Sequence, residues 1–446
     1  MPEFLRLSPP AEALQILLSA LPDGERATEI LDTIHALGRV LAVDLLAPHP
    51  LPEFTRSSVD GYAVCSRDTF GASESQPSYL TLLGEVRMSD IPPFTLTPGT
   101  CVLIHTGGML PNGADAVIMM EFTQVISEGG EKEGEREKIK GVTENLLRQK
   151  EEMNLFGKKE IEISRAVAEG ENVIYLGEDV RDDQIVLTAG KQIRPEDIGG
   201  CMALGIVKLR IATKPKIGII SSGDEVIPPN QHPRPGQIRD VNSYSLAALV
   251  EGAGGKPILY GIVPDSLESM KTTATKALKE CNALVITAGS SVSSRDTTAE
   301  AIATLGAPGV LIHGINIRPG KPTILAVCGG KAVIGLPGNP VSALVIARLI
   351  LVPIIGKLLS VTTKPQATVH AKLTVNVPSQ AGREEWVSVR LISTTPAFLP
   401  KGGWLAAPVF GKSNLIFSLA TADGMVYIPP DVTGISAGEM VEVVLM

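Results

Sequence analysis

The chain has 446 residues, enough for about three or four domains at roughly 100–200 residues each. Hydrophobic residues make up 44% of it and aromatic residues only 4%, so its cores must be aliphatic. The net charge of −8 argues against nucleic acid as the main partner, because phosphate backbones bind to basic surfaces. It does not exclude an anionic small molecule, since a local basic pocket can lie in an acidic protein.

The sequence also lacks the usual signs of secretion, zinc binding and membrane insertion. Its five cysteines show no Cys-x-x-Cys spacing, as is typical of a reducing cytosol, and its six histidines show no His-x-x-x-His pair. Residues 1–18 carry charges and prolines where a secretory signal needs an apolar run. Residues 343–355 are apolar but include Arg348 and Pro353, and the stretch is too short to cross a bilayer. We therefore expect a cytoplasmic protein with one buried apolar helix and no membrane partner.

The first third of the chain changes from helical to β patterning. Apolar spacing predicts helices at 10–21 and 28–40, and the proline-rich segment 48–52 then disfavours helix. Short alternating runs follow up to residue 122, with strands expected at 79–86, 101–106 and 116–121. These runs predict a small β domain.

A charged segment interrupts this β region. Residues 127–159 are dense in Glu, Lys and Gly, which predicts a solvated loop, and 160–166 alternates again as the returning strand. The chain continues with an expected strand at 185–188, a helix at 194–204 and a strand at 207–212.

The clearest architecture begins after Lys214-Pro215. Apolar strands alternate with helices there: strands at 216–221, 258–263, 283–287, 310–317, 323–327 and 332–335, and helices at 242–252, 266–279, 297–305 and 341–355. This alternation predicts a doubly wound, mostly parallel sheet covered on both faces. After residue 365 the chain returns to β, with strands at 367–375, 385–390, 404–408, 425–428 and 441–445 that predict a small barrel or sandwich.

Polar loops follow the strands of the predicted α/β domain. Because such sheets bind ligands at the carboxyl ends of their strands, we expect one site built from loops 222–225, 264–265, 289–296, 318–321 and 336–340. Serine hydroxyls before a helix can seat a phosphate, and Arg318 and Lys321 add positive charge. Carboxylates beside an anion call for a divalent cation, and Mg²⁺ typically takes one or two of them with phosphate oxygens.

A structural interpretation of the same loops stays open. Gly-Asp-Glu and Pro-Gly-Asn-Pro are common turn sequences. Asp265 could cap the helix that begins near Ser266, Asp296 could complement the dipole of the next helix, and Asn339 could cap the last one. Gly411-Lys412-Ser413 lacks the glycine that a phosphate-binding P-loop has five positions earlier, so it is no such loop.

Six motifs occur in the order in which a known family carries them. They are Ser58–Val64 (SVDGYAV), Thr106-Gly107 with 111–117 (PNGADAV), Gly177–Asp179 (GED), Ser222–Glu225 (SGDE), Pro319–Pro322 (PGKP) and Gly335–Pro340 (GLPGNP). Over nearly its whole length the chain resembles the molybdopterin molybdenumtransferase family, which comprises the MoeA proteins and the C-terminal domain of gephyrin.

The resemblance implies a multidomain fold of α/β and β parts in a homodimer. The implied parts are a helical linker domain at 1–47 and 165–213, an inserted β domain at 48–164, an adenylyltransferase-like, doubly wound α/β molybdopterin-binding domain at 214–360, and a small C-terminal β-barrel domain at 361–446. The family's site lies where the α/β domain of one subunit faces the inserted domain of the other.

The resemblance also implies an activity. The family inserts molybdenum or tungsten, taken from molybdate or tungstate, into molybdopterin-AMP (adenylylated molybdopterin) with Mg²⁺, and releases AMP and the metal cofactor. Further expected partners are a molybdopterin adenylyltransferase and the apo-molybdoenzymes that receive the cofactor.

Motif positions carry the family's residue roles to this chain. The implied catalytic residues are Asp60, Thr106, Asp179, Glu225, Asp265 and Asp296, of which Glu225, Asp265 and Asp296 are the implied metal ligands. The implied cofactor-binding residues are Ser222, Gly223, Asp224, Gly289, Ser290, Ser291, Ser293, Arg318, Lys321, Pro337, Pro340 and Ser342. Asp60 and Asp179 are expected to come from the facing subunit.

The serine loop departs from the family pattern. It reads Gly289-Ser290-Ser291 where two glycines usually begin it, and the added side chains crowd a phosphate that needs close backbone approach. Two alternatives therefore stay open beside the transferase. One is a molybdopterin-binding carrier or scaffold without turnover, and the other is an adenylyltransferase that uses the α/β domain alone.

Overall fold

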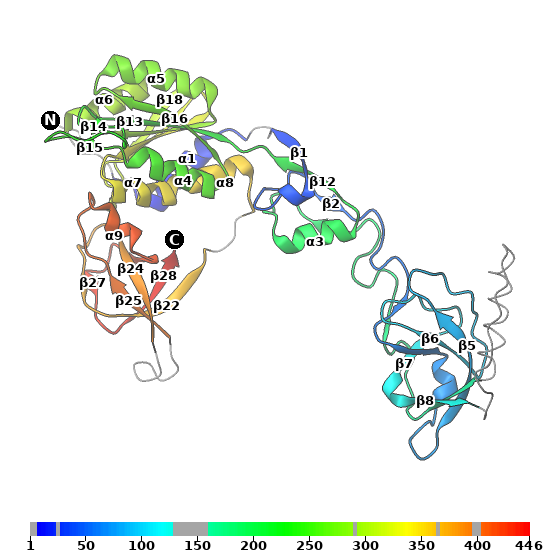
Figure 1. Ribbon diagram of the computed structural model, residues 1–446. Helices are drawn as coiled ribbons and strands as arrows, with labels where there is room; N and C mark the ends of the chain where they lie inside the picture. Colours follow the sequence, from blue (N-terminus) through cyan, green and yellow to red (C-terminus); the bar gives the residue numbers. More distant parts are fainter. Residues whose placement is uncertain (1–6, 24–26, 128–158, 289–291, 363–365, 395–402) are drawn as a thin grey trace. The chain divides into compact units, whose positions relative to one another are not determined.

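The computed structural model describes residues 7–23, 27–127, 159–288, 292–362, 366–394 and 403–446, with backbone alone at 127, 288 and 292–296. It has two compact units (Figure 1). Unit 1 comprises Met1–Val43, Ala189–Ile198 and Val207–Met446, and unit 2 comprises Asp44–Thr188 and Gly199–Ile206.

Unit 2 is built on a six-stranded sheet with the order β7-β4-β6-β5-β9-β8. Its strands are β4 (Gly61–Val64), β5 (Ser78–Val86), β6 (Thr100–Ile104), β7 (Ala116–Met119), β8 (Thr123–Ser127) and β9 (Lys159–Ile163). Side chains of β4 alternate between two cores, with Tyr62 and Val64 in one and Ala63 in the other. The sheet is therefore covered on both faces, and the three strands predicted here are confirmed.

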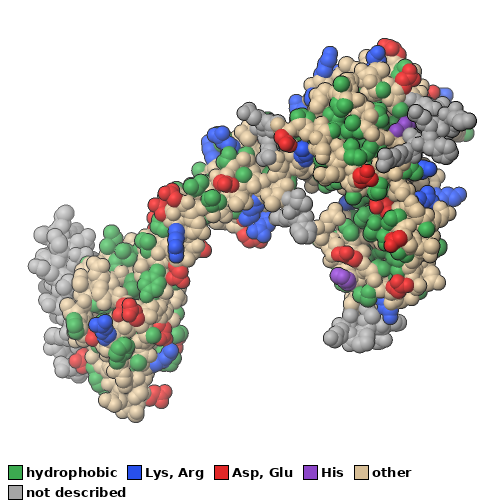
Figure 2. All heavy atoms as spheres, turned by 180° about the vertical axis from the view of Figure 1, so that it is seen from behind, with side chains coloured by type: hydrophobic (Ala, Val, Ile, Leu, Met, Phe, Trp, Pro, Cys, Tyr) green, Lys and Arg blue, Asp and Glu red, His purple; other side chains and the backbone are tan. Residues whose placement is uncertain are grey.

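Short strand pairs join segments of unit 2 that are far apart in the sequence. β2 (Leu45–Leu46) pairs with β11 (Ile185–Leu187), and β3 (Arg56–Ser57) pairs with β10 (Val173–Ile174). Charged side chains of both signs are interspersed on the face of this unit that Figure 2 shows. Residues 128–158, most of the predicted charged loop, lie outside the described residues, but β9 confirms the predicted returning strand.

The helix predicted at 28–40 is wrong. Residues Thr28–Asp32 form strand β1, which runs antiparallel to β12 (Lys208–Ala212), and a single 3-10 turn, Thr33–His35, follows. The partner strand lies about 180 residues later in the chain. The local spacing of apolar residues carries no information on such a distant pairing. The β-branched residues Thr28 and Ile30 favour a strand, a preference that the apolar spacing does not include.

Helix α3 (Pro195–Ala203) confirms the helix predicted at 194–204, and Asp197 anchors its first turn. Asp197 is 6% exposed, and its carboxylate accepts hydrogen bonds from Lys191 Nζ at 2.6 Å and from the backbone N–H of Arg194 at 3.0 Å. Burial alone would raise its pKa, but the hydrogen bonds from Lys191 and Arg194 outweigh burial and hold the pKa below the ordinary 3.8.

We expect Asp197→Asn to lower the free energy of unfolding by about 1–3 kcal/mol at neutral pH, because it removes a charge-assisted contact to Lys191. Since the pKa is depressed in the folded state, this stabilisation is complete above pH 3.8 and is lost as the pH falls through the folded value. Denaturant unfolding between pH 3 and 7 measures both effects. Glu196→Gln, at an exposed neighbour, is the control, and equal stability of the two variants would contradict the prediction.

The α/β part of unit 1 has the sheet order β16-β13-β17-β21-β20-β18. Its strands are β13 (Lys216–Ser222), β16 (Lys256–Val263), β17 (Ala283–Ala288), β18 (Pro308–His313), β20 (Ile324–Cys328) and β21 (Lys331–Pro337). The first four in the order run parallel, and β20 runs antiparallel to both its neighbours. The prediction of a mostly parallel sheet is confirmed.

Helices cover both faces of this sheet, as Figure 1 shows. Helices α5 (Leu267–Glu280) and α6 (Val292–Ala303) pack on one face. The other face carries α1 (Pro10–Ala20), α4 (Asn242–Gly252), α7 (Pro340–Ile346) and α8 (Val352–Leu359). Continuous apolar strands such as β20, buried at every position, follow from this double cover.

Residues Pro340–Leu359 form one apolar helical stretch of 20 residues, because a π turn at Ala347–Leu351 joins α7 to α8. By length and composition it could cross a membrane, so the expectation that it is too short was wrong. Its side chains, including Ile346, Ile350 and Ile354, fill the core beneath the sheet. The predicted buried helix is confirmed.

The C-terminal part is a closed barrel. Strands β24 (Glu384–Thr394), β25 (Gly403–Pro408), β22 (Thr368–Leu373), β28 (Met440–Leu445) and β26 (Gly424–Ile428) pair in that order, and β26 pairs back to β24. Strand β19 (Ile317–Arg318), which precedes Pro319-Gly320-Lys321, pairs with β24 through Arg318 and Glu385. The barrel therefore borders the loop that carries the predicted basic residues.

Candidate functional site

In unit 2 the structure brings Asp60 and Thr106 together. Asp60 lies just before β4 and Thr106 just after β6, two antiparallel neighbours in the sheet. Oδ1 of Asp60 accepts hydrogen bonds from the Thr106 N–H at 2.7 Å and from the Thr106 hydroxyl at 3.2 Å. These two bonds hold the pKa of Asp60 below its ordinary value of 3.8, so this exposed carboxylate is ionised near neutral pH.

Gly61 explains why the motif around Asp60 needs a glycine. A Cβ at Gly61 would lie 1.9 Å from the carbonyl oxygen of Ile118 on β7, so no side chain fits there. The close approach of the two backbones fixes the chain directly after Asp60. Sequence reasoning missed two further side chains here, His105 and Glu85. The sequence offers only one sign of them, the position of His105 directly before Thr106.

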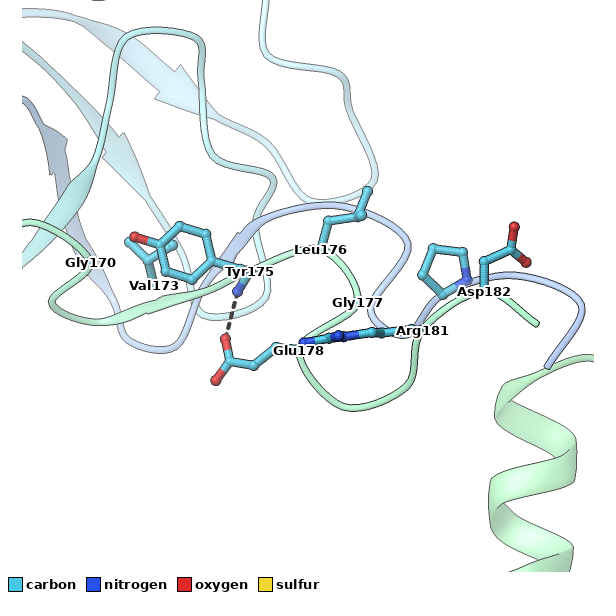
Figure 3. Close-up of a pocket in the computed structure, with 9 residues that line it drawn as sticks. Gly170, Val173, Tyr175, Leu176, Gly177, Glu178, Arg181 and Asp182 are labelled. Carbon is cyan, nitrogen blue, oxygen red and sulfur yellow. Dashed lines mark hydrogen bonds between the residues drawn. The ribbon is translucent and has the colours of Figure 1, made fainter. Parts of the chain in front are cut away.

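Asp179 lies on a different loop of unit 2. Its backbone N–H donates to the carbonyl of Leu51, and among the described residues no hydrogen bond joins its side chain to Asp60 or Thr106. Next to it lies a cavity of about 670 Å³ whose lining includes Tyr175 and Glu178. The carboxylate of Glu178 turns back to accept from the N–H of Tyr175 at 2.8 Å (Figure 3).

In unit 1 the loops at the carboxyl ends of β13 and β16 meet. The hydroxyl of Ser222 donates a short hydrogen bond to the carboxylate of Asp265, whose own N–H donates to Oδ1 of Asp224 at 3.2 Å. Helix α5 is capped by Ser266, which accepts from the N–H of Ser269. The alternative that Asp265 caps this helix is therefore wrong, and its carboxylate bonds Ser222 instead.

One cavity at this edge, of about 640 Å³, is called the edge cavity here. Its lining includes three of the predicted site residues: Ser222, Glu225 and Pro340. The Glu225 carboxylate lies over Gly223, where an added Cβ would come within 2.8 Å of Oε2. Sequence reasoning missed Asp240, Asn242 and Asn414, which also line the edge cavity.

A second cavity, of about 840 Å³, lies between the α/β part and the barrel and is called the basic cavity here. Four of the predicted residues line it: Arg318, Lys321, Pro337 and Ser342. The barrel adds Arg383, Lys412 and Ser413, which sequence reasoning missed because it weighed Lys412-Ser413 only as a P-loop.

The two cavities adjoin, because Asn339 and Asn414 line both. Asn339 stands at the N-cap of α7, but its side chain makes no cap hydrogen bond. Its Nδ2 donates to the hydroxyl of Ser413 on the barrel side at 3.1 Å, so the predicted cap is wrong and Asn339 joins the two parts.

Only part of the predicted serine loop lies within the described residues. Gly289, Ser290 and Ser291 lie outside the described residues, as do the side chains of Ser293 and Asp296. The backbone of Ser293 and Asp296 lies in the first turns of α6, which begins at Val292 rather than at the predicted residue 297.

The carboxylates at the carboxyl ends of the α/β strands suit a Mg²⁺ ion that is also bound by substrate and water. Within the described part of the chain, no three His, Cys, Asp or Glu side chains form a metal cluster. Of the two described candidates, Glu225 lines the edge cavity and Asp265 lies outside its lining. Both offer carboxylate oxygens, the ligands that Mg²⁺ prefers. They fit an ion held by one or two carboxylates and completed by substrate phosphate and water, and not an all-protein cage.

Comparison with known proteins covers the chain in three parts. The MoeA N-terminal region (domains I and II) matches residues 8–205, a probable molybdopterin-binding domain matches 218–357, and the MoeA C-terminal region (domain IV) matches 370–446.

Individual relatives match over nearly the full length. A putative molybdopterin biosynthesis protein of Methanocaldococcus jannaschii is 33% identical, covering 96% of this chain and 95% of that protein. A molybdopterin molybdenumtransferase of Nostoc sp. is 30% identical, covering 96% of this chain and 91% of that protein. The crystal structure of a MoeA protein of molybdopterin biosynthesis from Pyrococcus horikoshii has a TM-score of 0.80 and 32% identity, covering 99% of this chain and 100% of that one. The chain therefore belongs to the MoeA family.

Proposed function

We propose that this chain transfers molybdenum or tungsten to molybdopterin-AMP, using molybdate or tungstate and Mg²⁺, and releases AMP. The observation that carries the proposal is the pair of adjoining cavities in unit 1. One is strongly basic, and the other mixes two carboxylates, those of Glu225 and Asp240, with Arg239, amides and hydroxyls. The names of the relatives support the same activity.

The basic cavity suits a small oxyanion. Its lining carries four cationic side chains, Arg318, Lys321, Arg383 and Lys412, against one carboxylate, that of Glu385. Glu385 lies 3.3 Å from Arg318 and neutralises only that cation. A tetrahedral dianion such as molybdate would gain charge-assisted hydrogen bonds from the remaining three.

The edge cavity suits the pterin and its phosphate. We propose that Glu225, which lines this cavity, holds Mg²⁺ together with Asp265 and Asp296, while Ser222, Gly223 and Asp224 shape the loop around the phosphate. The serine loop and Pro340 would complete the seat, and Pro337 and Ser342 would line the adjoining basic cavity. Bound Mg²⁺ would neutralise charge on the phosphate oxygens.

The residues of unit 2 would act from a second subunit. We propose a homodimer in which Asp60, Thr106 and Asp179 of the partner subunit assist metal transfer or AMP release. Asp60, ionised and held by Thr106, is suited to orienting a water or a protonated group. We also propose the four-domain division at 47/48, 164/165, 213/214 and 360/361.

The proposed activity has a direct test. Purified protein is incubated with molybdopterin-AMP, Mg²⁺ and either molybdate or tungstate, and AMP is measured by chromatography. We expect AMP release that depends on the oxyanion. No AMP with either oxyanion would refute the transferase. Tight pterin binding without AMP would then support a carrier or scaffold, and ATP consumption with free molybdopterin would support an adenylyltransferase.

We expect Arg383→Ala and Lys412→Ala each to raise the KM for molybdate about tenfold, while the KM for molybdopterin-AMP changes by less than about twofold. Both remove a cation from the basic cavity but leave the edge cavity intact. Lys372→Ala, on barrel strand β22 and outside both linings, is the matched control. An unchanged KM for molybdate in both variants would show that molybdate does not bind in the basic cavity.

A further inference from the structure

An imidazole lies between two carboxylates beside Asp60. Nε2 of His105 lies 2.8 Å from Oε1 of Glu85, and Nδ1 of the same ring lies 3.7 Å from Oδ1 of Asp60. All three side chains are 38–58% exposed, so a ligand can reach the cluster from solvent.

The sheet of unit 2 brings these residues together. His105 follows the last residue of β6, and Glu85 lies near the end of β5, which runs parallel to β6 with Glu85 paired to Leu103. Asp60 precedes β4, whose first residue pairs with Ile104 on the other side of β6. Three adjacent strands therefore place the cluster at one edge of a rigid sheet, where side-chain positions are well defined.

The hydrogen-bond pattern gives each group a role. When Nε2–H donates to Glu85, Nδ1 carries a proton only in the imidazolium form, and that form attracts Asp60. Among the described residues, every hydrogen bond and ion pair of the Asp60 carboxylate uses Oδ1. Thr106 thus holds Oδ1 by two hydrogen bonds, the imidazolium form of His105 attracts the same oxygen, and Oδ2 is left for a reacting group.

We propose that His105 is a positioning residue that fixes the Asp60 carboxylate together with Thr106, and that Glu85 orients the His105 ring. The proposal rests on the proposed function, which assigns Asp60 to the transfer step. His105 acts through Asp60 and Glu85 acts through His105, so the three form a chain of contacts and not three independent contributions.

The kinetic test uses His105→Leu and His105→Gln in the full chain. We expect His105→Leu to lower kcat for AMP release about tenfold with KM changed by less than about twofold, because a misplaced carboxylate affects the reaction more than binding. His105→Gln, which keeps a side-chain N–H, should recover part of the loss. An unchanged kcat in His105→Leu, when Asp60→Asn is inactive, would overturn the proposal.

A double variant tests the chain of contacts. Glu85→Gln alone should lower kcat about threefold, and Glu85→Gln with His105→Leu should be no slower than His105→Leu alone. Multiplying effects would mean that Glu85 acts independently of His105. His49→Gln is the matched control, because it removes another histidine–carboxylate contact in the same unit, to Glu53 at 3.5 Å, and should leave kcat unchanged.

A second readout needs no turnover. The Asp60 carboxyl resonance in ¹³Cγ-aspartate-labelled protein, assigned by its loss in Asp60→Asn, reports the ionisation of that side chain. After Thr106, His105 contributes to the lowered pKa of Asp60, so His105→Leu should raise the titration midpoint. His49→Gln should not move it. If no AMP is released by any variant, the proposed function fails, and an unmoved Asp60 midpoint alone would overturn this inference.

Discussion

Glu225→Ala is expected to lower kcat/KM for AMP release about 100–1,000-fold, the loss typical of removing a charged group that acts on a transition state. Glu225 lines the edge cavity, and its place is fixed by backbone hydrogen bonds on both sides: Val226 N–H donates to Gly223, and Ile238 N–H donates to the carbonyl of Glu225. The substitution removes a proposed Mg²⁺ ligand without disturbing that backbone. Steady-state AMP release across a Mg²⁺ titration measures the loss.

Asp296→Ala should behave in the same way, because it is assigned to the same ion. Glu268→Ala is the matched control, since Glu268 is an exposed carboxylate in the first turn of α5 and lies outside both cavity linings. Both active-site variants should elute as wild type in size-exclusion chromatography. Full activity of both Glu225→Ala and Asp296→Ala would show that these residues do not bind the cation.

Gly61→Ala is expected to destabilise unit 2 by about 2–4 kcal/mol. The added methyl group would overlap the Ile118 carbonyl at 1.9 Å, and relief requires β4 and β7 to separate where Tyr62 and Val64 are buried. Because β4 is central in the order β7-β4-β6, the change also shifts Asp60, so activity should fall with stability. Thermal unfolding and AMP release, measured on the same preparation, test both.

The control for Gly61 is the same change at a permissive site. Gly200 lies inside α3 with no atom within 4 Å of an added Cβ. Gly200→Ala should leave the free energy of unfolding unchanged or raise it by up to about 1 kcal/mol, since alanine favours helix. A Gly61→Ala variant as stable as Gly200→Ala would show that the backbones of β4 and β7 adjust at little cost.

Sequence patterns predicted the elements whose signal is local. The strands of the α/β sheet and helix α3 follow from runs of apolar residues and from turn residues at their ends. Strand β1 was missed because its partner β12 is far away in the chain, and apolar spacing within 28–40 does not record it. The motif resemblance indicated the family, which relatives at 30–33% identity then confirmed.

The residues of the candidate site also differ in whether their sequence signal is local. The loops after β13, β16 and β21 were predictable because parallel strands bring their carboxyl ends to one edge. Arg383 and Lys412 were not, since only the pairing of β19 with β24 carries the barrel to that edge. His105 was missed for a related reason: its contacts with Glu85 and Asp60 depend on the order of three strands, which a single sequence does not specify.

The pairing of β8 with β9 has a consequence for how this family can vary. Ser127 and Lys159 face each other at the end of an antiparallel ladder, so the two points where the intervening sequence leaves and rejoins the sheet are already adjacent. Closing a longer connection between fixed points costs only about 0.6 kcal/mol for each doubling of its length. The length of that connection can therefore change during evolution at little cost in free energy. A tag or a new recognition segment could be accepted there while strands β4 and β6, which adjoin Asp60 and His105, keep their register.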